Sequence, residues 1–316
     1  KTGLVQFHPF RAGAERGALH IRQMLLGTAG SALAAAPLAW LLNFLDWREI
    51  YQLAAAISVV LAILTISLVR NTPEDLGFAA INPALQPPLP AQKNQPVVAS
   101  IARSVWDVLK IPGVWAAAVI QFGVAAASFS FIGLWGIPLL QDSYDLSRGA
   151  AASYATVMIV GAGLGTFAMG TISDLMGKRK PVIIVGSVGA LLGWTLLAHA
   201  PVETGSTMMI GFFIFGLLAT GTSVSYGVAK ELVPSQQAGI AMALVNTGLF
   251  LGAALHQPIF GWLLDIGWNG QMQDGRPLYA ATDYSRALSL NIGYAALATL
   301  ALFALPETWC GRSTDK

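Results

Sequence analysis

Long apolar runs dominate the chain, and short polar segments separate them. Eight of these runs approach the roughly 20 residues that a helix needs to cross a bilayer. They lie at approximately 19–43, 49–69, 113–140, 149–172, 181–200, 206–229, 239–264 and 287–306. We interpret all eight as membrane-spanning helices, because buried helices of a large soluble protein would rarely give so many long uncharged runs in one chain. The pattern predicts an all-α integral membrane protein.

Composition supports this interpretation. Charged residues make up 11% of the 316 residues and hydrophobic residues 55%, whereas about 25% of a typical soluble domain is charged. So few charges could not cover a soluble globule of this size. The net charge of +2 is too small to indicate a nucleic-acid partner. The single cysteine, Cys310, excludes an internal disulfide and offers no metal-ligand cluster, so we expect no metal and no cofactor.

Basic residues are distributed unevenly between alternate loops. One side of the predicted membrane carries Lys1, Arg11, Arg16, Arg22, Arg70, Lys93, Arg103, Lys110, Lys178, Arg179, Lys180, Lys230, Arg312 and Lys316. The other side carries Arg48, Arg148, Arg276 and Arg286. Because basic loops favour the cytoplasm, we expect both ends of this sequence on the cytoplasmic side of an inner membrane, and the protein to be multi-pass.

A proline-rich connection divides the chain. Residues 71–112 contain six prolines before Pro112 and favour an extended linker, which predicts three parts: 1–70, 71–112 and 113–316. Near its end, Ile101, Val105 and Val108 have helical spacing. We therefore expect a short helix over 98–109 that lies on the cytoplasmic face of the membrane.

The first and seventh runs resemble each other at an offset of 221 residues. The identical pairs are Gly27 with Gly248, Ala32 with Ala253, Pro37 with Pro258, Leu42 with Leu263 and Trp47 with Trp268. This repeat places equivalent helices six spans apart in the same orientation, as two parallel six-helix halves would. We therefore expect twelve helices in two bundles, of which the sequence contains eight, with four more upstream.

The most distinctive polar segment lies between the fourth and fifth runs. Gly170, Asp174, Gly177, Lys178 and Arg179 match the signature Gly-x-x-x-Asp-Arg/Lys-x-Gly-Arg/Lys-Arg/Lys, which the major facilitator superfamily has between the second and third helices of a half. The flanks of the first run and the central linker also resemble those of that family. The chain thus resembles helices five to twelve of such a transporter, and some of its loops are similar to the sugar-phosphate-permease-like branch.

The signature also has a physical basis in its residue types. The carboxylate of Asp174 can meet a cation or a helix N-terminus, and Gly170 and Gly177 permit close approach and a tight turn. The basic triplet that begins at Lys178 suits an anionic inner surface. The resemblance implies that this loop acts as a gate, although Leu175 stands where the family has a cation, which weakens a salt bridge at that position.

Polar residues within the spans are candidates for lining a transport cavity, because polar groups that face lipid are costly. Gln121, Ser128 and Trp135 are seven residues apart and should share one face of a helix. The remaining candidates are Tyr226, Asn246, Gln257 and His256.

Several of these polar and small residues have structural alternatives. His256 is a candidate proton carrier, but a histidine hydrogen-bonded between helices is an equal alternative. Serines of membrane helices often bond their own backbone. The glycines Gly161, Gly163 and Gly165 are expected to allow close helix packing.

Some kinds of residue and motif are missing from the spans. No Asp or Glu lies deep in any predicted span, and the third span has no arginine to handle a phosphate, which argues against a sugar phosphate as the solute. His199 and His256 lack a metal-binding spacing, and no nucleotide-binding loop is present, so we expect no enzyme and no ATP-driven pump.

The sequence therefore predicts a monomeric secondary active transporter that moves a small polar or organic-anion solute by alternating access, coupled to protons or another ion. The alternatives are a drug or toxin exporter of the same fold and a non-transporting membrane sensor. The expected partners are the solute, the lipid bilayer and protons.

Overall fold

The computed structural model describes residues 41, 44–68, 97–200, 204–273 and 275–311. It divides into two units, Lys1–Gln95 and Pro96–Lys316. Nearly all of the first predicted span and residues 71–96 of the predicted linker lie outside the described residues.

The first unit contains helix α2, Trp47–Leu68. At its start, the Asp46 carboxylate accepts a hydrogen bond from the Trp47 amide, and the Glu49 carboxylate accepts one from the Asp46 amide, each at 2.8 Å. These bonds satisfy amide groups that a helix N-terminus leaves free. Further along, the Ser58 and Thr65 hydroxyls donate to carbonyls four residues earlier. The helix satisfies these polar groups internally, as an apolar environment requires.

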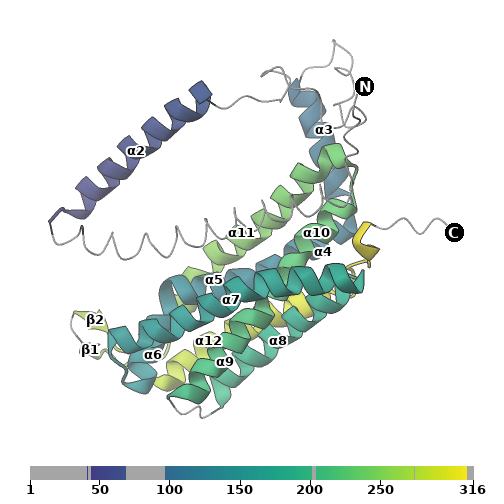
Figure 1. The fold of residues 1–316 in the computed structure, drawn as a ribbon. Helices are drawn as coiled ribbons and strands as arrows, with labels where there is room; N and C mark the ends of the chain where they lie inside the picture. Colours follow the sequence, from purple (N-terminus) through teal and green to yellow (C-terminus); the bar gives the residue numbers. More distant parts are fainter. Residues whose placement is uncertain (1–40, 42–43, 69–96, 201–203, 274, 312–316) are drawn as a thin grey trace, which may run out of the picture. The chain divides into compact units, whose positions relative to one another are not determined.

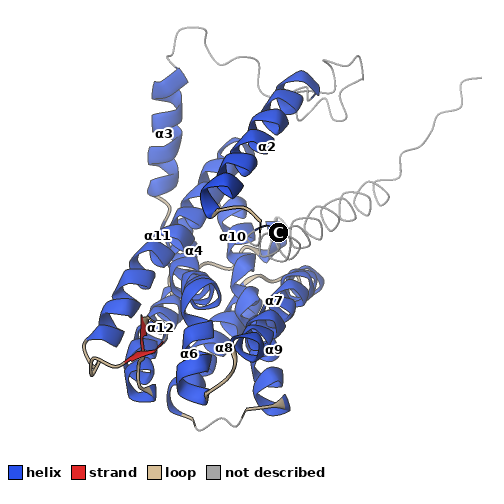
Figure 2. Cartoon of the chain, turned by 90° about the vertical axis from the view of Figure 1, so that its left-hand side faces the viewer, coloured by secondary structure: helices blue, strands red, loops and turns tan. Residues whose placement is uncertain are grey.

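The second unit is a bundle of long helices with one small hairpin (Figures 1 and 2). Its helices are α3 (Val97–Leu109), α4 (Pro112–Ile120), α5 (Ala126–Ser130), α6 (Gly136–Tyr144), α7 (Arg148–Met176), α8 (Lys180–His199), α9 (Ser206–Ala219), α10 (Ser225–Glu231), α11 (Ala238–Asp265) and α12 (Ala281–Ala301). Short π- or 3₁₀-helical segments are η3 (Gln121–Ala125), η4 (Phe131–Trp135), η5 (Thr220–Val224), η6 (Ser235–Gln237) and η7 (Trp309–Gly311). Strands β1 (Met272–Gln273) and β2 (Arg276–Pro277) pair antiparallel.

Six helical stretches of the described residues are long and apolar enough to cross a membrane: Trp47–Leu68, Pro112–Tyr144, Arg148–Met176, Lys180–His199, Ser206–Glu231 and Ser235–Asp265. They confirm the second to seventh predicted spans as helices. The eighth, expected at 287–306, is helix α12, which begins earlier and ends at Ala301. It is not among the six, and it carries the polar residues Asp283, Arg286 and Asn291. The short helix expected over 98–109 is α3.

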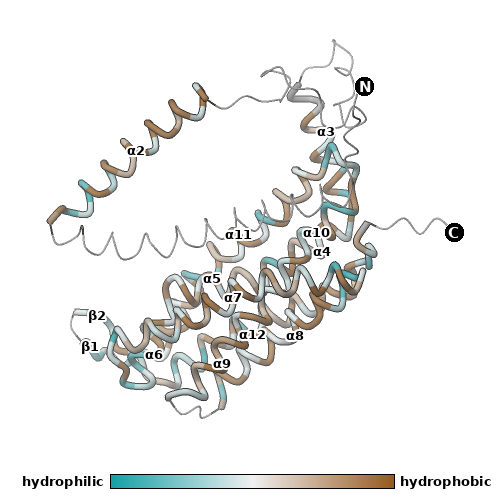
Figure 3. Tube along the Cα trace, viewed as in Figure 1, coloured by the Kyte–Doolittle hydropathy of each residue, from teal (hydrophilic) through white to brown (hydrophobic). Residues whose placement is uncertain are grey.

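Within the bundle, α7 packs along α9, α8 packs along α12, and α11 packs against the third span and α12. The buried core has two clusters. One contains Phe131, Trp194 and Phe260, and the other contains Val114, Ile183 and Val228. Figure 3 shows the apolar residues along the helices and hydrophilic ones at β1 and β2.

Glycines form a seam between α7 and α9. A Cβ atom at Gly161 would collide with the carbonyl oxygen of Phe213, and one at Gly165 would collide with that of Leu217. These two glycines therefore permit close packing, as predicted. A Cβ atom at Gly163 would meet nothing within 4 Å, so the same prediction is wrong for Gly163, which lies on another face of the helix.

The third span is not a uniform α-helix. It is interrupted by two π-helical segments, η3 and η4. A π-helical turn holds one residue more than an α-helical turn, and such segments are frequent at functional sites. The uniform period that places residues seven apart on one face therefore does not hold along this span.

Candidate functional site

The bundle has two ends that differ in character. We call the end with the α7–α8 turn the turn end, and the end with β1 and β2 the hairpin end. The five signature residues predicted as a gate come to the turn end. Its turn is built by Gly177, which ends α7 with a positive φ of 62°, a conformation that favours glycine. Gly170 does not make a close approach, since a Cβ atom there would meet nothing within 4 Å.

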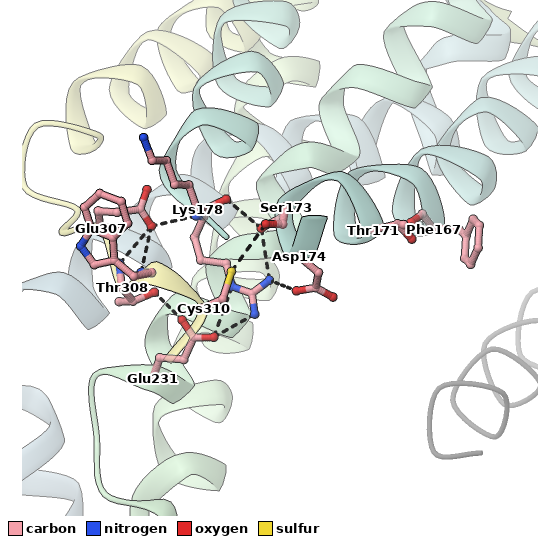
Figure 4. A network of polar contacts seen from close by, with 11 residues as sticks. Phe167, Thr171, Ser173, Asp174, Lys178, Glu231, Glu307, Thr308 and Cys310 are labelled. Carbon is pink, nitrogen blue, oxygen red and sulfur yellow. Dashed lines mark hydrogen bonds and ion pairs between the residues drawn. The ribbon is translucent and has the colours of Figure 1, made fainter. Parts of the chain in front are cut away.

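Figure 4 shows the polar network at the turn end, with Asp174 and Glu231 labelled. The centre of this network is Arg179. Its side chain is only 16% exposed. It donates hydrogen bonds to the Asp174 carboxylate at 2.6 Å and to the Ser173 hydroxyl at 3.1 Å, both on α7. It also donates two bonds, at 2.9 and 3.2 Å, to one carboxylate oxygen of Glu231 at the end of α10. One guanidinium thus joins α7 to α10, and the two carboxylates hold the pKa of Arg179 above its ordinary value although burial opposes this.

The segment after α12 completes this network through Glu307. Its carboxylate accepts hydrogen bonds from the backbone amides of Arg179 at 2.7 Å and Lys180 at 3.0 Å, where α8 begins. It also accepts bonds from the amides of Thr308 and Trp309. Burial raises the pKa of this carboxyl, but the four amide bonds outweigh burial and leave the pKa below its ordinary value. Glu307 therefore acts as an N-terminal cap supplied by a distant part of the chain.

Three further contacts hold the same segment, two of them to the α7–α8 turn and one to the end of α10. The Lys180 ammonium donates to the Leu305 carbonyl at 2.8 Å. The Thr308 hydroxyl donates to Glu231. The Lys178 ammonium lies 5.2 Å from the centre of the Trp309 ring, within cation–π range.

Sequence reasoning found one part of this network and missed another. Asp174 meets a cation, as expected, and that cation is Arg179. Leu175, at the family's cation position, is 82% exposed. Glu231 and Glu307 were missed. The available signal was their place directly after a span, near an end already predicted to be basic.

The predicted cavity residues are distributed over several elements. Gln121 is buried, and its amide nitrogen donates to the Thr222 carbonyl at 2.9 Å and to the Ser225 hydroxyl at 3.0 Å. Trp135 instead stacks on Phe260 of α11, with ring centres 5.2 Å apart. The expectation that these residues share one face is wrong, because the π segments change the register between them. Ser128, between the two segments, is half-buried.

Two of the four remaining candidates bond to each other, and a third bonds to a residue outside the predicted set. The Tyr226 hydroxyl donates to the exposed Asn246 amide oxygen at 3.0 Å. His256 is buried, and its Nε2 lies 2.9 Å from the amide oxygen of Asn291 on α12. This is the interhelical hydrogen bond that was the alternative to a proton carrier. Gln257 is half-buried.

The aromatic neighbours of His256 connect it to the third span. Its ring stacks on that of Phe260 and meets that of Tyr294 edge to face, with ring centres 5.5 and 5.2 Å apart. Tyr294 in turn stacks on Phe122 of η3 at 4.7 Å. Among the residues that the structure describes, no three His, Cys, Asp or Glu side chains gather as metal ligands would.

Comparison with known proteins gives consistent family matches. The family model of the Major Facilitator Superfamily matches residues 117–308. The glycerol-3-phosphate transporter of Bacillus subtilis is 26% identical over 81% of this chain and 60% of its own length. The membrane sensor protein UhpC of Escherichia coli is 25% identical over 74% of this chain and 54% of its own. The 3-(3-hydroxy-phenyl)propionate transporter of Escherichia coli is 27% identical over 73% and 53%.

These relatives are named as transporters or as a sensor, not as enzymes, and the first two confirm the similarity to the sugar-phosphate-permease-like branch. The chain spans about half to three fifths of their lengths. The apolar helices and the family match together identify an integral, multi-pass membrane protein. With a family model that covers well over half of its residues, the chain belongs to the major facilitator superfamily.

Proposed function

We propose that the protein of which this chain is part is a secondary active transporter. It moves a small polar or organic-anion solute by alternating access, driven by protons or another ion. In this proposal the turn end faces the cytoplasm, because most of the basic residues lie on that side of the predicted membrane. The proposal places the transporter in an inner membrane as a monomer.

The observation that carries the proposal is the Arg179 network. Alternating access by rocking needs bundles that move largely as rigid bodies. Arg179 and Glu307 link the ends of α7, α8 and α10 and the segment after α12 through hydrogen bonds at one end of the bundle. Such a network supports a gate that opens and closes as a unit, with Asp174 as its most exposed carboxylate.

The nature of the solute follows from the polar groups that remain accessible. Asn246 is exposed and bonded to Tyr226, and Gln257 is half-buried, so these three side chains are our candidates for contact with a polar solute. Gln121 and His256 are buried and bonded within the bundle, which favours a supporting role. The third span, Pro112–Tyr144, contains no arginine. This favours a carboxylate over a phosphate ester, in line with the relative named for a propionate.

Transport by the reconstituted full-length protein tests this proposal. The protein is placed in vesicles under an imposed proton gradient and offered carboxylates, phosphate esters, sugars and hydrophobic cations. We expect uptake of a carboxylate or polar solute that stops when an ionophore removes the gradient. We also expect Asp174→Ala to lower the rate while the amount of inserted protein stays unchanged. Absence of movement for the whole panel, in either direction, would contradict the proposal.

A sensor is the second candidate, and the similarity to UhpC favours it specifically. A sensor would bind a solute without moving it. Stabilisation of the purified protein against heat by a member of the panel, with no uptake of that same compound, would support the sensor instead.

A further inference from the structure

The hairpin end contains a buried carboxylate that the transport proposal does not use. Asp142 lies in the last turn of α6, and its side chain is 0% exposed. One of its oxygens lies 2.8 Å from the guanidinium of Arg276, on β2. The other accepts a hydrogen bond of 2.8 Å from the hydroxyl of Tyr284, in the first turn of α12. A buried carboxylate is tolerated only with such partners, so the contacts constrain where α6 can lie.

The hairpin that carries Arg276 is itself firmly built. Gln273 pairs with Arg276 across the two strands. The Trp268 indole and the Leu278 amide both donate to the Gln271 carbonyl, at 2.9 and 3.0 Å. These contacts hold the two strands and the residues beside them in a defined position.

The third span has an irregular backbone where α6 begins. The π-helical segment η4 precedes it. Gly133 within that segment is surrounded by open space, where a Cβ atom would meet nothing within 4 Å. Pro138, in the first turn of α6, has no amide hydrogen to donate to the preceding turn. Backbone interruptions of this kind are where helices bend.

We propose that Asp142 is a latch that fixes α6, as a separately movable tip of the third span, to the hairpin and to α12. The tip and the hairpin also line a hollow of about 620 Å³, to which Pro138 and Gln141 contribute from α6 and Gln273 and Arg276 from the hairpin. Release of the latch would therefore change the width of this hollow, which the proposed orientation places on the outer side. The latch does not depend on the identity of the solute, nor on whether the protein transports at all.

Hydrogen–deuterium exchange of the purified full-length protein tests the latch without a solute. We expect Asp142→Asn and Arg276→Gln each to speed exchange of the amides in 136–144 on the order of tenfold, because each removes the 2.8 Å ion pair of the buried carboxylate. Tyr284→Phe keeps the ion pair and should give a smaller increase, about threefold. Asp145→Asn is the matched control, since it removes the same charge from an exposed residue three positions away, and it should change nothing.

The double variant Asp142→Asn/Arg276→Gln separates a latch from general damage. If the two residues act as one pair, it should exchange no faster over 136–144 than either single variant. Peptides of α7 and α9 should exchange as in the unchanged protein, which shows that the bundle remains folded. Unchanged exchange over 136–144 in Asp142→Asn would overturn the proposal, and so would an equal rise throughout the bundle.

Discussion

The two ends of the bundle both rely on a guanidinium and a carboxylate, but the buried partner differs. In the Arg179–Asp174 pair at the turn end the cation is the less exposed member, with Arg179 16% and Asp174 67% exposed. At the hairpin end it is the anion, with Asp142 0% and Arg276 38% exposed. In each case the buried member gathers partners from several elements. Burial, rather than the sign of the charge, therefore indicates which residue of a pair connects the elements at that end. Asp174, the most recognisable residue of the signature, lies at the periphery of the turn-end network.

Substitution in the glycine seam between the two ends has the largest expected effect on the free energy of unfolding. It also tests whether the two ends can be treated as separate units. Gly161→Ala should lower the free energy of unfolding by about 3 kcal/mol, because overpacking against the Phe213 carbonyl forces α7 away from α9. Gly163→Ala is the control and should be neutral or slightly stabilising, since it adds helix propensity in open space. The apparent melting temperature in detergent measures both. If Gly161→Ala speeds amide exchange at only one end, the two ends open independently. An equal rise in the exchange rate at both ends would show that they open together as one unit.

Arg179→Gln has the next largest expected effect. It removes the hydrogen bonds to Asp174 and Glu231 and leaves the Glu231 side chain, 15% exposed, without its cation. We expect a loss of about 2–3 kcal/mol, seen as a lower apparent melting temperature. Lys178→Gln removes a neighbouring charge that lies only over the Trp309 ring and should cost about 0.5 kcal/mol. Equal losses of unfolding free energy for the two variants would contradict the role of Arg179 as the main stabilising residue of the turn end.

The same substitution at the two ends sharpens the comparison directly. Asp142→Asn should cost about 2 kcal/mol, because it leaves Arg276 without the buried charge that holds it. Asp174→Asn should cost less than about 1 kcal/mol, because that carboxylate is mostly solvated. Denaturation of the two purified variants under identical conditions measures the difference. A larger loss for Asp174→Asn than for Asp142→Asn would show that side-chain exposure does not predict which carboxylate contributes more to stability.

The smallest expected effect is a dependence on pH at the turn end. The pKa of Glu307 in the folded protein is below its ordinary value of 4.5, so its contribution is complete above pH 4.5 and is lost as the pH falls through the lower, folded-state pKa. Amide exchange over 307–310, corrected for its intrinsic dependence on pH, should therefore rise in acid. Glu307→Gln should already exchange fast at neutral pH and show no further rise. A rise that persists in this variant would assign the effect to another group.

Local patterns predicted much of this structure. The apolar runs identified the six spans from Trp47–Leu68 to Ser235–Asp265, since each span is long enough to give a clear signal. The signature predicted the turn at Gly177 because a glycine after a helix adopts positive φ at little cost.

The partners of the signature could not be predicted in the same way. Glu231 and Glu307 lie 52 and 128 residues from Arg179, and only the packing of the bundle brings them to it. Gly163 could not be separated from Gly161 without knowing which face of α7 meets α9. The prediction that Trp135 shares a helix face with Gln121 was wrong, because it assumed a period of 3.6 residues throughout the third span.

The two π-helical segments give the third span a tolerance for changes in length. Each accommodates one residue beyond an α-helical turn. Deletion of one residue from η4 would leave an ordinary α-helix, and everything after it, Asp142 included, would keep nearly the same direction about the helix axis. A change of one residue at these two places, which would disrupt a regular membrane span, is thus absorbed within one turn and leaves the side chains that follow on their original faces.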